Sequence, residues 1–197
     1  MSFWKNNSYD IVRLFINQVG ITIFSLVMYF AVELTNIDKN TTGYELLVAI
    51  SVFSTLFYLV LIYTASWEYG AKDKIKIDSG KISYSGCKGA ILGVYANIPN
   101  FALAILALAC IGIYSISGAE GFYTAFGLLN LPIRFLSSMY LGILQGAFAS
   151  LSNQVVLHAT LQTAGFALMP VFPILVGHLG YSLGVREKHL FSFAKNR

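Results

Sequence analysis

Charged residues are scarce in this chain. Only 11% of its 197 residues are Asp, Glu, Lys or Arg, against about 25% in an ordinary soluble domain. So few charges cannot cover the surface of a soluble globule of this size, and a hydrophobic share of 56% excludes a disordered chain. Together with a mean hydropathy of +0.67, this composition favours a protein embedded in lipid.

Several short patterns that carry enzyme chemistry are also missing. The sequence contains no H-E-x-x-H, no G-x-G-x-x-G and no G-x-x-x-x-G-K-[ST] pattern. Its three histidines have no metal-ligand spacing, and its two cysteines, Cys87 and Cys110, are too few for a disulfide framework. We therefore expect a protein that is not an enzyme and that has no cofactor, no metal site and two free thiols.

Basic residues exceed acidic ones and give a formal net charge of +4. They lie in short stretches between apolar runs, an arrangement typical of topology signals and of contacts with lipid headgroups. We therefore expect the lipid bilayer, and no nucleic acid, as their partner.

Four apolar runs are long enough to cross a bilayer as helices. The first run would extend ~31 Å as a helix, which is about one hydrocarbon thickness. We therefore predict an all-α integral membrane helical bundle that forms a single transmembrane domain over 1–197. Its predicted spans cover about 14–34, 44–67, 89–114 and 164–183.

The stretch 121–163 is apolar enough to enter lipid but is interrupted by Pro132 and Arg134. Lys and Arg gather at the N-terminus, in the loop 68–88 and in the C-terminal tail. The positive-inside rule places all three in the cytoplasm, which requires an even number of crossings. We prefer four full spans, with 121–163 as a re-entrant or interfacial element on the outer side. Six spans, in which this stretch crosses twice, and five spans are the alternatives.

The lysine loop has its own pattern. Apolar and polar residues alternate over 74–77 and 81–84 on either side of Gly80, which predicts a small hairpin-like loop. A solvated loop without regular structure is the alternative. In either form we expect the lysines of this loop to contact anionic lipid headgroups. These lysines are Lys72, Lys74, Lys76, Lys81 and Lys88.

Two groups of polar residues fall inside the predicted membrane segments. Asn97 and Asn100 flank Pro99, which should kink the third span. The two amides either present polar groups to a solute, as broken helices do in transporters, or only bond to the backbone groups that the kink leaves free.

Arg134 and Glu33 are expected in or near hydrocarbon, where a lone charge is costly. We therefore predict a Glu33–Arg134 pair, with Glu120 as the competing partner of Arg134.

Small residues four apart allow two membrane helices to approach closely. Gly89 and Gly93 have this spacing at the start of the third span, and Gly180 and Gly184 have it near the end of the last span. We expect these four glycines to mark helix-packing faces.

The segment Trp67–Asp73, followed by Lys88-Gly89, Asn97-Ile98-Pro99 and Pro170–Gly184, resembles uncharacterised multi-pass membrane proteins of Gram-positive bacteria. The resemblance implies a bacterial plasma membrane and supplies no activity. The function we expect is that of a non-catalytic membrane component, acting through contacts between helices, with a second copy or with a membrane-complex partner. A small-solute transporter or channel that uses the Asn97/Pro99/Asn100 break is the alternative, and a membrane-embedded enzyme comes third.

Overall fold

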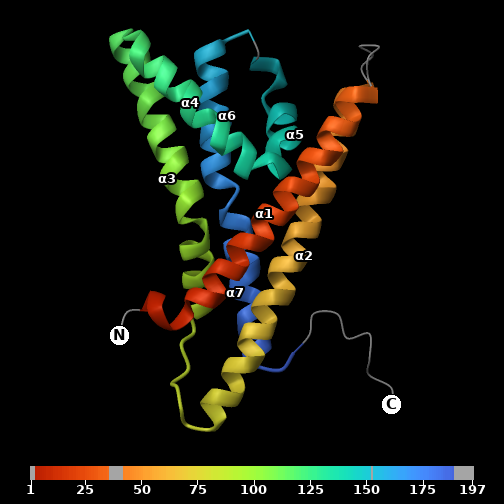
Figure 1. Ribbon diagram of the computed structural model, residues 1–197, viewed down its shortest axis with the longest axis vertical. Coiled ribbons are helices and arrows are strands. Elements are labelled where there is room, and N and C mark those ends of the chain that lie inside the picture. The colour runs from red at the N-terminus through yellow and green to blue at the C-terminus, as the bar shows by residue number, and fades with distance from the viewer. Residues whose placement is uncertain (1–2, 36–41, 152, 189–197) are drawn as a thin grey trace. The chain divides into compact units, whose positions relative to one another are not determined.

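The computed structural model describes residues 3–35, 42–151 and 153–188 (Figure 1). All regular secondary structure in this part of the chain is helical, which confirms the predicted all-α class. The elements are α1 (Phe3–Thr35), α2 (Thr42–Asp78), α3 (Lys88–Ser117), α4 (Glu120–Leu136), α5 (Ser138–Ala147), the 3-10 turn η1 (Ala149–Leu151), α6 (Val155–Leu168) and α7 (Val171–Val185).

Four helical segments of the described chain are long and apolar enough to cross a membrane: Phe3–Val32, Glu45–Asp78, Lys88–Ser117 and Val155–Val185. A fifth is available only if α4 and α5 are counted as one span, and these two helices are bent by 111° at their junction. Figure 1 shows the sharp turn between them. The described residues supply at most five such segments, one fewer than the alternative of six spans requires, since 121–163 holds this bent pair and the start of the Val155–Val185 segment.

The predicted hairpin-like loop is wrong. Residues 74–78 are the last turns of α2, and no described residue of this loop is in a strand. Ion pairs along the helix, from Lys74 to Asp78 and from Lys76 to Asp73, favour the helical form. The glycine expected at the hairpin turn instead ends the helix: Gly80 has φ +72°, and the N–H groups of Gly80 and Lys81 donate to the carbonyls of Ile77 and Lys76. This is a Schellman C-cap, which favours glycine because of its positive φ.

Contacts divide the chain into two compact units. The loop unit comprises Met1–Asn17, Leu59–Ala96 and Val171–Arg197, and the bent-pair unit comprises Gln18–Tyr58 and Asn97–Pro170. The long helices α1, α2 and α3 each contribute one part to each unit.

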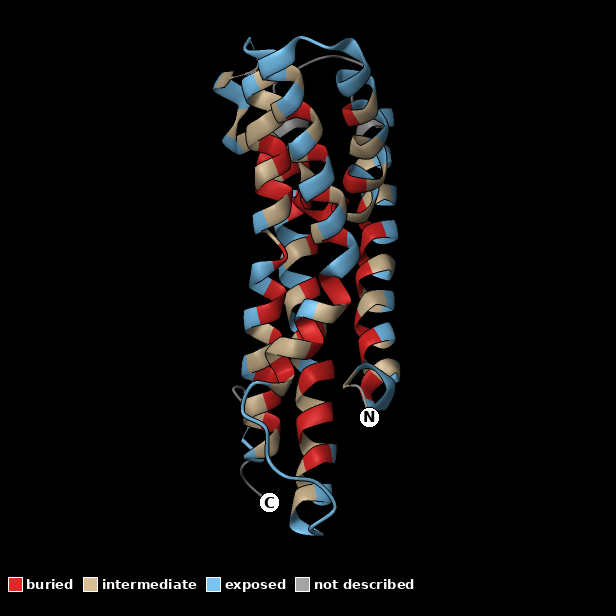
Figure 2. Ribbon diagram, turned by 90° about the vertical axis from the view of Figure 1, so that its left-hand side faces the viewer, coloured by how far each residue is buried: buried red, intermediate tan, exposed pale blue. Residues whose placement is uncertain are grey.

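Along the long helices, buried and exposed residues lie on different faces (Figure 2). The exposed faces are strongly apolar, for example at Val27 and Phe30 of α1 and at Phe53 and Leu56 of α2. An apolar exterior around a partly polar interior is compatible with insertion into a membrane.

Glycines set the close packing of the loop unit. A side chain at Gly184 would collide with the carbonyl oxygen of Trp67, and one at Gly180 would lie 2.6 Å from the carbonyl oxygen of Tyr63. Both contacts bring α7 against α2 at backbone distance. On α3, an added Cβ at Gly89 would lie 2.6 Å from the Cβ of Tyr181. The close approach of α2, α3 and α7 fixes the geometry of the charged cluster described next.

Candidate functional site

The most polar buried point of the loop unit is the carboxylate of Asp73, on α2. Its side chain is only 5% exposed, and three helices supply its partners. Lys88 Nζ at the start of α3 lies 2.6 Å from Asp73 Oδ2, and the hydroxyl of Tyr181 on α7 donates to the same oxygen at 2.9 Å. Lys76 Nζ lies 3.6 Å from Oδ1. A buried carboxylate is tolerated when it is paired and hydrogen-bonded in this way.

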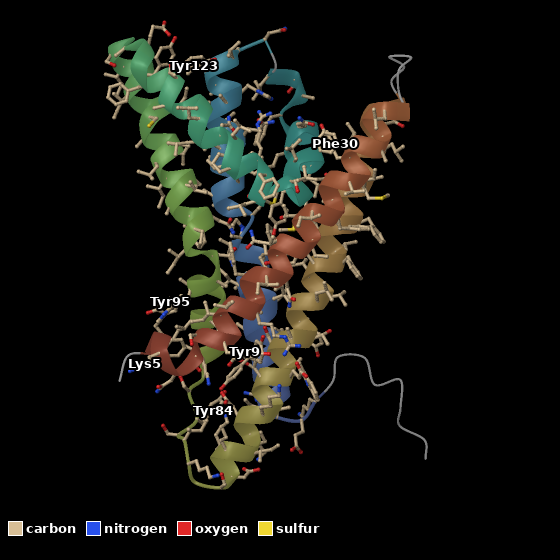
Figure 3. All side chains as sticks on the ribbon, viewed as in Figure 1. Lys5, Tyr9, Phe30, Tyr84, Tyr95 and Tyr123 are labelled. Carbon is tan, nitrogen blue, oxygen red and sulfur yellow. The ribbon has the colours of Figure 1, made fainter. Side chains whose placement is uncertain are left out.

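A cavity of about 700 Å³ opens beside this cluster, within the loop unit. Four parts of the chain line it: the first turns of α1, the end of α2 with the following loop, the start of α3, and Tyr181 of α7. Figure 3 labels Tyr84 on that loop and Lys5 and Tyr9 on the turns of α1. The lining residues are Phe3, Asn6, Asn7, Asp73, Lys76, Lys81, Ile82, Ser83, Lys88 and Tyr181.

A second ion pair joins α1 to α2 in the same unit. Arg13 Nη1 lies 2.9 Å from Glu68 Oε2, and its guanidinium lies 5.6 Å from the centroid of the Tyr69 ring. Both charged side chains are partly exposed, so this pair adds little to stability by itself. It links α1 to the part of α2 that belongs to the loop unit.

In the bent-pair unit, polar side chains of α1 and α2 bind the backbone where α4 meets α5. The carbonyl of Leu136 accepts hydrogen bonds from Gln18 Nε2 at 3.2 Å and from Thr22 Oγ1 at 3.0 Å. Ser138 Oγ in turn donates to the carbonyl of Thr22 at 3.0 Å. On the α2 side, Ser51 Oγ accepts from the N–H of Gly142 at 2.8 Å. Side chains of α1 and α2 therefore anchor the junction on both sides.

Three buried side-chain oxygens near this junction have no hydrogen-bond partner among the described residues. They are Gln18 Oε1, Ser54 Oγ and Tyr140 Oη. Because most buried polar atoms in proteins are paired, these three oxygens are available to accept a hydrogen bond from a polar partner.

The structure also places the predicted intramembrane residues. Asn100 donates to Asn97 Oδ1 at 2.9 Å within α3; the two asparagines lie one helical turn apart on either side of Pro99, and both are buried. The two amides therefore bond to each other beside the proline.

Arg134 bonds to neutral partners. Its Nε donates to Asn130 Oδ1 at 3.1 Å, and its Nη2 donates to Gln162 Oε1 on α6 at 2.9 Å. Within the described part of the chain Arg134 forms no ion pair with Glu120. The side chain of Glu33 lies outside the described residues, so the Glu33–Arg134 pair stays a prediction.

The predicted lysines are not brought to one place. Lys76, Lys81 and Lys88 line the cavity, whereas Lys72 and Lys74 pair along α2 with Glu68 at 3.9 Å and Asp78 at 2.8 Å. The four predicted glycines all lie at close helix contacts: Gly89 and Gly93 face α7, and Gly180 and Gly184 face α2.

Sequence reasoning missed the residues that organise both regions. In the sequence, Asp73 is only one acidic residue among the lysines of the loop, because its partner Tyr181 lies 108 positions away. Gln18, Thr22 and Ser25, all buried, recur every three or four residues in the first apolar run. That spacing puts them on one helix face, a signal that could have been used.

One short pattern in α7 matches a catalytic motif. Gly180 to Gly184 has the sequence G-Y-S-L-G, which fits the G-x-S-x-G pattern of serine hydrolases. That chemistry needs the serine on a sharp strand-to-helix turn, whereas Ser182 lies inside the continuous helix α7. The backbone therefore does not provide the geometry that the motif requires.

Among the described residues, no group of three or more His, Cys, Asp and Glu side chains could hold a metal ion. Comparison with protein-family models, with curated proteins and with solved structures found no match to this chain.

Proposed function

We propose that this chain is a non-catalytic component of a bacterial plasma membrane, which acts through contacts between helices, with a second copy or with a membrane-complex partner. One observation carries the proposal: the polar side chains within the apolar helices hold other parts of the chain. Arg134 joins α4 to α6, and Ser51 joins α2 to α5. Gln18 and Thr22 bind the junction of α4 and α5.

The proposed topology has four spans, cytoplasmic termini and the α4–α5 pair as a re-entrant element. The 111° bend supports the last feature. Irregular backbone at membrane depth is stable only where protein groups satisfy it, and the side chains of Gln18, Thr22 and Ser51 supply such groups. The lysines of the loop and the basic C-terminal tail support a cytoplasmic side for both.

A second candidate, a pathway for a small polar solute, is favoured by the unpartnered buried oxygens of Gln18, Ser54 and Tyr140. Re-entrant elements and buried polar side chains are also features of channels and transporters.

The two candidates are separated by flux measurements on the purified protein in liposomes. Stopped-flow light scattering would follow the entry of urea and glycerol, and a fluorescent dye would follow potassium efflux. We expect rates equal to those of protein-free liposomes, together with a defined assembly larger than one chain after cross-linking in cells. Flux above the protein-free rate that falls in Tyr140→Phe and Ser54→Ala, but not in the exposed-site control Ser115→Ala, would instead establish the solute pathway.

A further inference from the structure

The cavity of the loop unit combines three lysines with neutral hydrogen-bond donors and an apolar wall. The amines come from different segments: Lys76 from the end of α2, Lys81 from the loop, and Lys88 from the start of α3. Around the same space lie Ser83 and Asn6, which can donate hydrogen bonds. A cavity of about 700 Å³ has room for a group much larger than a water molecule.

The charge balance of this cavity is positive. Three lysines and one aspartate line it, which leaves a formal charge of +2. Asp10 on α1 interacts electrostatically with Lys88 and, more weakly, with Lys76 and Lys72. Counting Asp10 with the three lysines and Asp73 leaves a formal charge of +1, so the balance stays positive.

Asp73 does not neutralise all three amines. Its Oδ2 accepts from both Lys88 and Tyr181, and Lys76 is its more distant partner at 3.6 Å. Lys81 forms no ion pair with any described residue and is exposed. The buried carboxylate thus holds Lys88 in place, while Lys76 and Lys81 keep most of their capacity to bind an anion.

We propose that this cavity binds a phosphate group. Several amines that converge from different chain segments, with hydroxyl and amide donors between them, match an anion with several acceptor oxygens. The apolar side chains of Phe3 and Ile82 line the same cavity and would contact the carbon atoms attached to the phosphate. Asp73 is a positioning residue, because its almost fully buried carboxylate pairs with Lys88 and fixes the place of that amine.

The phosphate could belong to a soluble phosphate monoester or to the headgroup of an acidic phospholipid. Two arms of one experiment distinguish these sources, using the full chain in phosphatidylcholine nanodiscs. In the first arm, calorimetry follows the titration of inorganic phosphate and glycerol 3-phosphate. In the second, native mass spectrometry counts phosphatidic acid molecules retained from nanodiscs doped with that lipid.

Two double variants make a matched comparison. Lys76→Gln/Lys81→Gln removes two positive charges from the cavity lining, and Lys72→Gln/Lys74→Gln removes two from the same end of α2 outside that lining. We expect the first variant to weaken binding by about fivefold for each lysine removed, the effect of one basic side chain near an anionic surface. The second variant should stay within about twofold of the unaltered protein. Saturable binding in the calorimetric arm identifies a soluble phosphate, and binding only in the lipid arm identifies a headgroup.

An independent variant, Ser83→Asp, leaves every lysine in place and adds a carboxylate to the cavity; it should abolish binding in whichever arm shows it. The proposal is overturned if neither arm gives saturable binding. It is also overturned if Lys72→Gln/Lys74→Gln weakens binding as much as the cavity variant, since the lysines would then act only as a diffuse positive surface. None of these outcomes depends on the flux or assembly measurements described above.

Discussion

Individual glycines decide how closely the helices of the loop unit approach. An alanine at Gly184 would place its Cβ against the carbonyl oxygen of Trp67, a backbone atom that cannot rotate away. Gly112 on α3 is the matched control, because nothing lies within 4 Å of an added Cβ there. We expect Gly184→Ala to lower the free energy of unfolding by about 1–3 kcal/mol, as overpacking does elsewhere. Gly112→Ala should leave it unchanged or raise it by up to ~1 kcal/mol through helix propensity.

The measurement is thermal unfolding of the two variants in the same neutral detergent. Equal midpoints for Gly184→Ala and Gly112→Ala would show that α2 and α7 do not pack at backbone distance.

At the scale of residues, the sequence indicates which side chains are suited to close packing, but it does not indicate what they pack against. The spacing of Gly180 and Gly184 marks them for close packing and distinguishes them from Gly112, which has Leu108 and Ile116 four positions away. It does not say that they face α2. The role of Asp73 could not be predicted, because its burial depends on packing against α7, whose sequence is remote.

At the scale of elements, the junction of α4 and α5 depends on two donors that share one acceptor. Gln18 and Thr22 both donate to the carbonyl of Leu136. Either variant alone, Gln18→Leu or Thr22→Val, leaves one donor, so each should lower the free energy of unfolding only slightly. The double variant leaves that carbonyl without either side-chain donor. It should lower the free energy of unfolding by about 1–3 kcal/mol more than the sum of the two single variants.

Hydrogen exchange followed by mass spectrometry gives the local readout. In the double variant, amides of residues 136–142 should exchange faster, while those of α7 should not change. Thr64→Val is the control, because Thr64 bonds only to the carbonyl of Val60 in its own helix. If exchange became faster by the same amount along the whole chain in the double variant, the two bonds would stabilise the protein in general and would not anchor the junction locally.

Element types and element ends differ in how well the sequence predicts them. The long apolar runs correctly predict helices, the form in which a segment satisfies its own backbone hydrogen bonds. The alternation over 74–77 was misleading, because two isoleucines are too few to outweigh the ion pairs that continue α2 to Asp78. The break near Pro170 fits proline chemistry, since α6 ends at Leu168 and α7 begins at Val171.

At the scale of the whole molecule, the proposed topology of four spans can be tested against one of five. Four segments qualify by length and composition, and the bent α4–α5 pair makes a fifth only if it is counted as one span. The two arrangements differ in one respect that can be measured: in four spans, the turns before α4 and before α6 lie on the same side, and in five they lie on opposite sides.

Single cysteines at Ser79, Ala119 and Asn153, in a background with Cys87→Ala and Cys110→Ala, distinguish these arrangements. Ser79 follows α2, Ala119 precedes α4, and Asn153 lies between η1 and α6. With four spans and a cytoplasmic lysine loop, an impermeant maleimide added to intact cells should label Ala119→Cys and Asn153→Cys and spare Ser79→Cys. Permeabilised cells provide the control, because all three cysteines should then react. Labelling of Ala119→Cys without Asn153→Cys requires five spans, and it would place the basic C-terminal tail outside, against the charge asymmetry of the sequence.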